Sequence, residues 1–429
     1  MKILHISTHM GGGVGHAISD LVTHDKNNAH MIVLLQKPEK TKYIDLCMRN
    51  RAEVFMECSI DKIADLMSKA DVVILHWWHH PVMCRFLYDF PSAPIRLVLW
   101  SHISGCTYPM ISHLFANKFS KVFFTSQYSL ENVNWSEEER EKIRNKSSIV
   151  YGLGELSLMQ QKCDYSLKND KLKVGYIGTL AKSKIHPKFP AICKEILNII
   201  PNAEFYLIGD MESGIWMRDE LQTLEIADKV HFEGYADNVN EWLTYFDIFG
   251  YPLNPYHFGT TENSILEAMS AGLPVVLLNQ ATEKNIVTHN EDGILAEGID
   301  DYAVWMARLA DNEQFREKLG RNAAKSVYKK FSFQKNIECF QKEMNEIVKL
   351  EQLTINFRDV LGNEPYDWFL SAVSEEDKDI LLGHKYDELQ PIFMEKAKSS
   401  IPHFTDSYPE DKMLSDIKKL WNTRGEENV

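Results

Sequence analysis

The sequence predicts an α/β protein with two Rossmann-like, doubly wound domains facing a cleft and a helical extension at the C-terminus. Short apolar runs of strand length alternate with helical patterns from Lys2 to residue 150, and the same alternation starts again at Lys173. Such alternation is typical of parallel sheets covered by helices, which bind ligands at the carboxyl ends of their strands. At 429 residues, the chain is long enough for two domains of ordinary size and a remainder.

The first predicted domain, residues 1–160, opens with a strand at Lys2–Ser7, a glycine loop and a helix. Glycines between a strand and a helix let the backbone approach a ligand closely, and the helix N-terminus adds a positive field. A tight structural turn is the alternative. The loop is not a G-x-G-x-x-G, so it is a weak signal for a nicotinamide cofactor. The loop glycines are Gly11, Gly12, Gly13 and Gly15, and the further strand candidates are Met31–Leu35, Val54–Met56, Val72–Leu75, Leu97–Trp100 and Val122–Thr125.

Histidines follow two of these strands. His76, His79 and His80 end one strand, and His102 ends another. A zinc site is one alternative, because imidazole is a common zinc ligand. The neighbours His79 and His80 are expected to point apart, and no Cys, Asp or Glu completes a recognisable ligand spacing. Core or surface histidines beside tryptophans are therefore favoured over metal ligands.

The second predicted domain, residues 161–330, follows a linker expected at residues 151–171. Residues 331–350 are predicted as a helix that crosses back to the first domain, with an apolar stripe typical of a core. Residues 351–429 are predicted as a helical extension that braces the first domain, forms a homo-oligomer or contacts a partner. Its only D-x-D, Asp377-Lys-Asp379, is interpreted as surface. The expected strands are Val174–Ile177, Ala203–Ile208, Val230–Gly234, a run ending at Phe249, Val275–Leu278 and Gly293–Leu295.

The most informative stretch runs from Leu253 to Asn279. A loop with the sequence Gly-Thr-Thr-Glu-Asn-Ser opens a helix, which ends at Gly272, a usual residue for a left-handed cap. Helix N-termini expose unpaired N–H groups and a positive dipole end, so this turn is suited to a diphosphate. Glu267 is placed to accept hydrogen bonds from two sugar hydroxyls. The alternative is that Ser264 and Glu267 form a capping box without a ligand.

This stretch resembles the donor-nucleotide signature of the GT-B retaining glycosyltransferases, the glycogen-synthase-like family 4 or group 1. In that family Glu, seven residues and a second Glu precede Ala-Met-x-x-Gly-x-Pro-Val-Val. The second Glu is Glu267 here, whereas the first position holds Gly259. The segment from Gly178 to Lys184 resembles the family's G-R-L-x-x-x-K-G, with Lys184 at the Lys and Thr179 where Arg is expected.

The resemblance implies a metal-independent, retaining glycosyltransferase that uses a nucleoside-diphosphate sugar, a UDP-sugar being favoured. The acceptor would be a glycan, a lipid-linked molecule or a protein, and no cofactor is implied. Glu262 would cover part of the role of the missing acid, His102 or else His76 would face a sugar hydroxyl, and Lys184 would neutralise the diphosphate. The implied catalytic residues are His102, Glu262 and Lys184, and the implied donor-binding residues are Gly12, Gly13, Thr179, Lys184, Tyr235, Asn263, Ser264 and Glu267.

Composition narrows the classes of function. The chain has 61 acidic and 47 basic residues, for a net charge of −14, which argues against a general nucleic-acid binder. Its seven cysteines contain no C-x-x-C and indicate reduced thiols, and no signal peptide or membrane-spanning run is recognised. A cytoplasmic protein is expected, with peripheral contact at the inner membrane face left open.

Two other functions remain open at this point. A nucleotide-sugar epimerase on the same fold would need a pair of carboxylates placed for elimination, which the sequence does not reveal. A non-catalytic nucleotide-sugar-binding protein is favoured by Gly259 and Thr179, the two departures from the family pattern. The nucleotide base, the donor sugar and the acceptor are not legible in the sequence.

Overall fold

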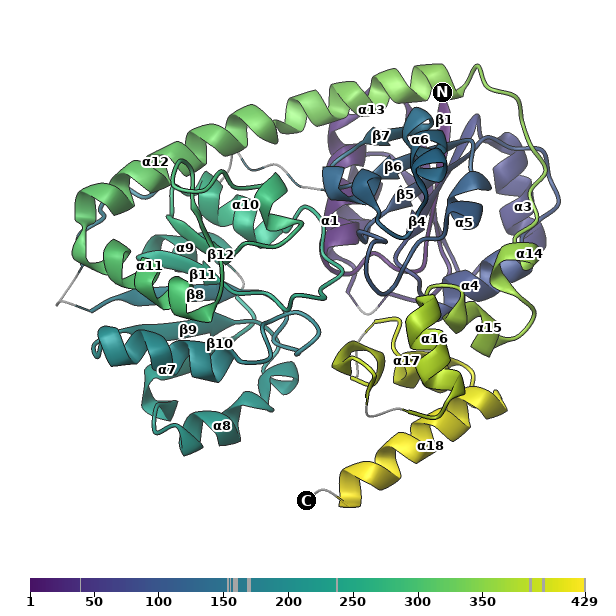
Figure 1. Ribbon diagram of the computed structural model, residues 1–429. Helices are drawn as coiled ribbons and strands as arrows, with labels where there is room; N and C mark the ends of the chain where they lie inside the picture. Colours follow the sequence, from purple (N-terminus) through teal and green to yellow (C-terminus); the bar gives the residue numbers. More distant parts are fainter. Residues whose placement is uncertain are drawn as a thin grey trace. The chain divides into compact units, whose positions relative to one another are not determined.

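The computed structural model (Figure 1) describes residues 1–38, 40–152, 154, 156, 161–167, 171–236, 238–385, 388–395 and 398–427. The chain divides into two compact units. The first unit contains Met1–Gly154, Phe258–Thr260 and Gln334–Val429, and the second contains Glu155–His257 and Thr261–Phe333. We describe each unit separately.

The first unit is built on a seven-stranded parallel sheet with the order β3-β2-β1-β4-β5-β6-β7. Its inner strands are buried on both faces, as expected for a parallel sheet covered by helices. The register places His5 of β1 between Ile32 of β2 and Ile74 of β4. The strands are β1 Lys2–Ser7, β2 Ala29–Leu34, β3 Glu53–Met56, β4 Val72–Trp77, β5 Leu97–Ser101, β6 Lys121–Phe124 and β7 Ser147–Ile149.

Helices from both ends of the chain belong to this unit (Figure 1). α13 belongs to the first unit from Gln334 onward. The N-terminal helices are α1 Gly12–His24, α2 Lys42–Arg49, α3 Ile60–Lys69, α4 Pro81–Tyr88, α5 His113–Asn117 and α6 Glu137–Asn145. The C-terminal helices are α13 Phe333–Ile347, α14 Arg358–Leu361, α15 Pro365–Leu370, α16 Glu375–Leu382, α17 Ile401–Ser407 and α18 Lys412–Glu427.

The C-terminal extension is part of the first unit's core. Phe357, Trp368 and Phe404 are buried in the same hydrophobic cluster as Trp77 and Met83. The ring of Trp77 packs on Phe115, and Phe115 packs on Phe357, so the aromatic contacts run continuously into the extension. Of the roles considered from the sequence, the structure supports bracing of the first unit.

The second unit has a six-stranded parallel sheet with the order β10-β9-β8-β11-β12-β13. Strand order reverses between β8 and β11, so the loops that follow these two strands diverge and leave a crevice at the carboxyl edge. The strands are β8 Lys173–Ile177, β9 Glu204–Ile208, β10 Val230–Gly234, β11 Ile248–Tyr251, β12 Val275–Leu278 and β13 Ile294–Ala296. The helices are α7 Phe189–Ile199, α8 Met217–Thr223, α9 Val239–Tyr245, α10 Asn263–Ser270, α11 Ile299–Asp311 and α12 Glu313–Lys330.

The predicted fold class is confirmed: two parallel α/β sheets are present, with helices at the C-terminus. β7 was not predicted, because Ser147–Ile149 is short and contains two serines. The predicted linker at 151–171 includes residues 153, 155, 157–160 and 168–170, which lie outside the described residues. The boundaries predicted at residues 160, 330 and 350 stay predictions.

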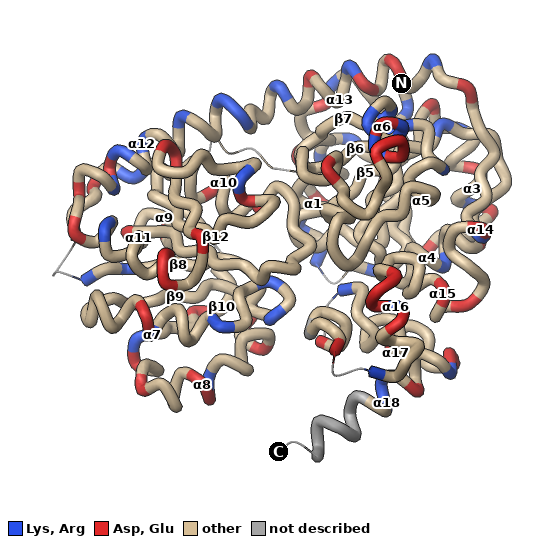
Figure 2. Tube along the Cα trace, viewed as in Figure 1, with Lys and Arg blue, Asp and Glu red and all other residues tan. Residues whose placement is uncertain are grey.

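Charged residues of both signs occur along the chain in both units (Figure 2). The charged stretch near Glu137 forms α6, which begins with a capping box between Ser136 and Glu139. A search of the described residues found no helix long and apolar enough to cross a bilayer.

Candidate functional site

The crevice of the second unit brings together two of the predicted residues. Lys184 lies in the loop after β8, and Glu262 lies in the loop after β11. The ammonium of Lys184 donates to both carboxylate oxygens of Glu262, at 2.6 Å each. The two side chains are only 16% and 6% exposed. Because strand order reverses between β8 and β11, this ion pair occupies the place where ligands of doubly wound sheets usually bind.

Glu262 holds an unusual backbone conformation at the start of α10. It is the N-cap residue, with φ of +48°, and its side chain makes no capping bond. A left-handed conformation is uncommon for a residue with a Cβ and stores strain, a feature that gathers at functional sites. Burial acts to raise the pKa of Glu262, but Lys184 and His257 outweigh it, so the pKa is lowered and the carboxylate is ionised.

The N-terminus of α10 presents the residues predicted to meet sugar and phosphates. Asn263 is the first helical residue and Ser264 the second. The Ser264 hydroxyl is hydrogen-bonded to Tyr251, whose hydroxyl also bonds Glu262. The alternative capping box between Ser264 and Glu267 is wrong, because the N-cap is Glu262 and Ser264 lies inside the helix.

The C-terminus of α10 follows the sequence prediction. Gly272 has φ of +75°. The N–H groups of Gly272 and Leu273 donate to the carbonyls of Met269 and Ala268, which is the bonding of a Schellman cap. Glu267 lies one turn inside the helix and is partly buried. The helix therefore begins at Asn263 and has its capped end at the glycine.

A hollow of about 320 Å³ opens at the carboxyl ends of β8, β9 and β10. This volume lies at the lower end of the range for small-ligand pockets. Thr179 and Tyr235 line it, and the Tyr235 side chain is 74% exposed. Its full lining is Ile177, Gly178, Thr179, Ile208, Gly209, Asp210, Tyr235, Ala236 and Val239. Two predicted donor-binding residues, Thr179 and Tyr235, therefore line the same hollow at the carboxyl edge of the sheet.

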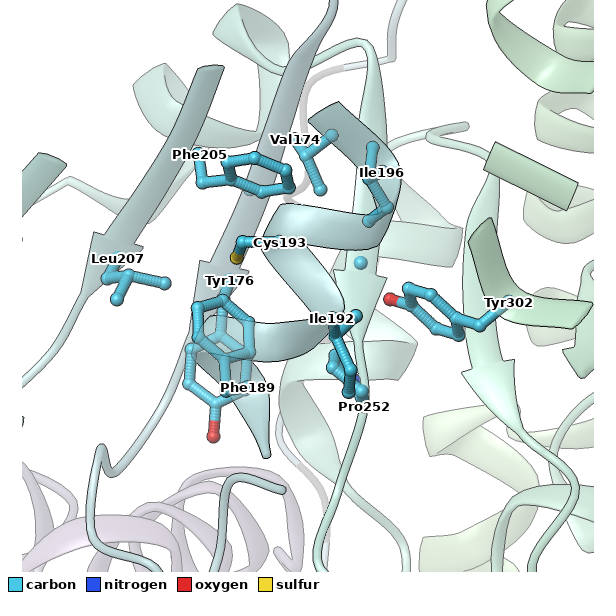
Figure 3. Close-up of a pocket in the computed structure, with 12 residues that line it drawn as sticks. Val174, Tyr176, Phe189, Ile192, Cys193, Ile196, Phe205, Leu207, Pro252 and Tyr302 are labelled. Carbon is cyan, nitrogen blue, oxygen red and sulfur yellow. The ribbon is translucent and has the colours of Figure 1, made fainter. Parts of the chain in front are cut away.

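A second pocket of this unit is a packing void rather than a site. Figure 3 shows side chains of α7, including Ile192, Cys193 and Ile196, pointing toward Phe205 on the sheet and Tyr302 on α11. Its volume is about 10 Å³, which is room for about one water molecule. Such a space is far too small for a nucleotide.

The glycine loop of the first unit leads directly into α1. The N-cap is Gly11, without a side-chain capping bond, and Gly12 has φ of +60°. A Cβ on Gly12 would meet no atom within 4 Å. Gly12 and Gly13 are exposed. This geometry leaves open space beside the helix N-terminus, and a role of Gly12 and Gly13 in binding stays a prediction.

His102 lies at a smaller hollow of the first unit, of about 70 Å³. Its Nε2 is 2.9 Å from Nδ1 of His76, which therefore lies behind it. Burial lowers the pKa of His102 to about 3, and the charge of Lys398 adds to this effect. The lining includes Val14, Trp78, His102, Ile103, Phe258 and Lys398. His102 is thus a neutral imidazole at the edge of a cavity.

The other histidines of the zinc alternative are occupied separately. Nε2 of His79 is 3.0 Å from the carbonyl oxygen of Trp368, and Nδ1 of His80 accepts from the N–H of Val82. In the described part of the chain, no three His, Cys, Asp or Glu side chains are grouped to hold a metal ion.

Sequence reasoning missed three residues behind His102, namely Asp25, His30 and His5. They lie on or beside β1 and β2 as single residues, without a motif, and only the strand order β2-β1-β4-β5 reveals them as neighbours. Tyr251 was missed for the same reason, since it reads as one more apolar residue of β11. A histidine inside an apolar strand, as in Ile3-Leu4-His5-Ile6, was the available signal.

These features define the class of protein. Two doubly wound parallel sheets of this kind form a GT-B fold. Among solved structures, HepE from Anabaena in complex with UDP-glucose is similar, with a TM-score of 0.64 at 15% identity over 81% of this chain and 100% of that one.

Sequence comparison identifies the family. Residues 171–312 match the family described as Glycosyl transferases group 1. N-acetyl-alpha-D-glucosaminyl L-malate synthase from Bacillus anthracis is 24% identical over 303 residues, 65% of this chain and 76% of that protein. 2-deoxystreptamine N-acetyl-D-glucosaminyltransferase from Niallia circulans is 26% identical over 168 residues, 38% of this chain and 42% of that protein. Residues 171–312 of this chain are therefore similar to the group 1 glycosyltransferases.

Proposed function

We propose that this enzyme transfers a hexose from a UDP-sugar to an acceptor hydroxyl, with retention at the anomeric carbon. The observation that carries the proposal is the crevice of the second unit, where Lys184, the N-terminus of α10 and the hollow beside Tyr235 all lie within the family match. The relatives named for N-acetylglucosaminyl transfer make UDP-N-acetylglucosamine the first donor to test.

The diphosphate would bind at the start of α10. In transfer, the bond from the anomeric carbon to the β-phosphate oxygen breaks, a bond from that carbon to the acceptor oxygen forms, and the acceptor proton leaves with the diphosphate. Negative charge therefore grows on the diphosphate in the transition state, and the helix N-terminus and Lys184 would stabilise it there. Asn263 and Ser264 would donate the nearest contacts to the phosphates and the sugar.

The bound state requires Lys184 to be shared. In this structure Glu262 holds its ammonium through both carboxylate oxygens. A diphosphate brings more negative charge than one carboxylate, so we propose that Lys184 contacts both while Glu262 keeps it aimed into the crevice. A direct catalytic role for Glu262 stays a prediction.

The nucleoside would occupy the hollow at the carboxyl ends of β8, β9 and β10. Tyr235 offers an exposed aromatic face beside it, and Thr179 offers a hydroxyl. Glu267 would accept hydrogen bonds from the ribose. From the first unit, we propose that His102 contacts a sugar hydroxyl and that Gly12 and Gly13 lie against the phosphates and the acceptor.

Calorimetric titration of the protein with UDP, GDP and ADP tests the nucleotide part. We expect UDP to bind most tightly, and the release of UDP from UDP-N-acetylglucosamine or UDP-glucose then tests turnover. Substitution Tyr235→Ala should weaken UDP binding about tenfold, because one aromatic–base contact is worth about 1.4 kcal/mol.

Tyr328→Ala is the matched control. Tyr328 is also exposed, on α12, and its hydroxyl accepts from Ser270 at the opposite end of α10. We expect this variant to bind UDP like the parent. The proposal would be abandoned if UDP did not bind, or if no sugar nucleotide were turned over.

A further inference from the structure

The first unit contains a row of histidines on neighbouring strands. His30 lies on β2, His5 on β1, His76 on β4, and His102 directly follows β5. Facing ring nitrogens are 3.0 Å apart from His30 to His5, 3.0 Å from His5 to His76, and 2.9 Å from His76 to His102. At the far end, Oδ2 of Asp25 is 3.3 Å from Nε2 of His30. We call Asp25, His30, His5, His76 and His102, in this order, the histidine chain.

Asp25 gives this chain a direction. Burial acts to raise the pKa of Asp25, but the facing ring of His30 and hydrogen bonds from Asn28 and Gln341 outweigh it and lower the pKa to about 2. Asp25 is therefore an anion at neutral pH, and a carboxylate only accepts hydrogen bonds. His30 accordingly carries its proton on Nε2, the atom that faces Asp25.

The direction then passes from ring to ring. Burial lowers the pKa of His5 and that of His76 well below the usual range, so each of these rings is neutral and carries one proton. With one proton on His30, held on Nε2, its Nδ1 is bare and accepts from Nε2–H of His5. The same assignment repeats at His76 and His102. With one proton on each ring, the reverse assignment would place a bare nitrogen of His30 against the carboxylate of Asp25.

The last ring ends at an open edge. Nε2 of His102 donates to His76, so its Nδ1 is bare, and no donor from the described residues is bonded to Nδ1. A Cβ on Gly152 would lie 3.3 Å from this Nδ1, so the glycine keeps the edge uncovered. The ring stacks on Trp100, with centroids 5.5 Å apart, and lines the hollow that Lys398 also lines. The ring that carries this acceptor atom thus lines a cavity.

We propose that Asp25, His30, His5 and His76 are positioning residues that fix the tautomer of His102, whose bare Nδ1 accepts a hydrogen bond from a hydroxyl of the sugar. The identity of this ligand rests on the proposed function, whereas the tautomer is a property of the protein alone. His5 and His76 are fully buried, where apolar side chains of similar shape would fill the sheet without needing partners. The histidine chain is therefore explained by its effect on His102, whose tautomer it fixes.

Nitrogen-15 NMR of the histidine rings tests the chain in the parent protein. We expect Nε2 of His102 to be protonated and Nδ1 bare, with nitrogen–nitrogen couplings across the hydrogen bonds from His5 to His76 and from His76 to His102. In Asp25→Asn, the carboxamide can donate to His30, so His102 should shift toward the tautomer protonated on Nδ1. Gln341→Leu is the matched control, because it removes one bond to Asp25 and keeps the charge; its His102 should be unchanged.

Kinetics then connect the tautomer to transfer. We expect Asp25→Asn to lower kcat about tenfold, with UDP affinity unchanged and near-ultraviolet circular dichroism like that of the parent. Absent couplings, or an unchanged His102 tautomer in a folded Asp25→Asn variant, would overturn the proposal. So would a changed tautomer with full kcat. If the parent turned over no sugar nucleotide, the proposed function would fall while the NMR result still decided the tautomer.

Discussion

The two units share one strand order up to the sixth strand and carry different chemistry near the reversal of that order. In the second unit, the carboxyl edge holds an ion pair between Lys184 and Glu262. In the first unit, the strands beside the reversal between β1 and β4 hold neutral imidazoles joined to one another. The same fold thus carries a buried ion pair in the second unit and a row of neutral imidazoles in the first.

The difference follows from what each site is proposed to meet. A diphosphate is a concentrated anion, which a cation and a helix N-terminus stabilise. A sugar hydroxyl is neutral, and a fixed acceptor such as a bare imidazole nitrogen suits it better than a charge. The comparison also predicts that acid, loss of charge and loss of a hydroxyl affect the two units differently.

The largest expected difference between the two units is the loss of stability in acid. The pKa of His102 is lowered to about 3 and those of His5 and His76 are lowered well below normal, whereas unfolded histidine titrates near about 6.5. The unfolded state therefore binds more protons, and the stability of the first unit falls as pH drops below that value, by up to about 1.4 kcal/mol per pH unit for each ring.

The second unit is expected to resist longer. Glu262 has a lowered pKa, so its contribution is fully present above the unfolded carboxyl pKa of about 4.3 and is lost only below it. Urea unfolding at about pH 7.5 and about pH 5, followed by pulsed hydrogen exchange and mass spectrometry, reports each unit separately. A midpoint that fell equally in both units would contradict this prediction.

Loss of the Lys184 charge should be the next largest effect. Lys184→Ala leaves the carboxylate of Glu262, whose side chain is 6% exposed, without its cation, which should destabilise the second unit by about 3 kcal/mol. UDP affinity should also fall about tenfold or more. Urea unfolding and calorimetry measure the two effects.

Two variants sharpen this test. Lys171→Ala removes an ion pair of the same 2.6 Å length in the same unit, but its lysine side chain is 49% exposed, so stability should hardly change. The double variant Lys184→Met with Glu262→Gln should recover part of the lost stability, because neither position then holds a buried, unpaired charge. Equal losses of stability in Lys184→Ala and Lys171→Ala would contradict the prediction, because they would show that burial of the ion pair does not change its contribution.

The smallest effects concern two serines with the same S-x-x-E spacing. Ser136 caps α6 in a capping box with Glu139, so Ser136→Ala should lower stability by about 1 kcal/mol and leave UDP affinity unchanged. Ser264 bonds Tyr251 instead of capping α10, so Ser264→Ala should weaken UDP binding with little loss of stability. Denaturation midpoints and UDP titrations of both variants measure the two effects. Identical changes in stability and in UDP affinity for the two variants would contradict the prediction.

The sequence determined the architecture and one half of the site. Alternating strand and helix patterns were sufficient for both sheets apart from the edge strand β7, because periodicity and glycine or proline stops are local. Gly272 could be assigned to the left-handed cap, since a helix followed by Gly, one residue and Pro has few other structures. Lys184 and the start of α10 stood out because their residues are adjacent in short motifs.

Only the tertiary structure decided the rest. The pairing of Lys184 with Glu262 joins residues 78 positions apart, and the contact between His79 and Trp368 joins residues 289 positions apart. The histidine chain depends on strand order, because His30, His5 and His76 become neighbours only when β2, β1 and β4 lie side by side. Ser264 and Ser136 look alike in the sequence, and they differ because the left-handed turn at Glu262 moves the helix start by two residues. Such contacts are set by how the backbone is folded together, and no local pattern of residue types contains that information.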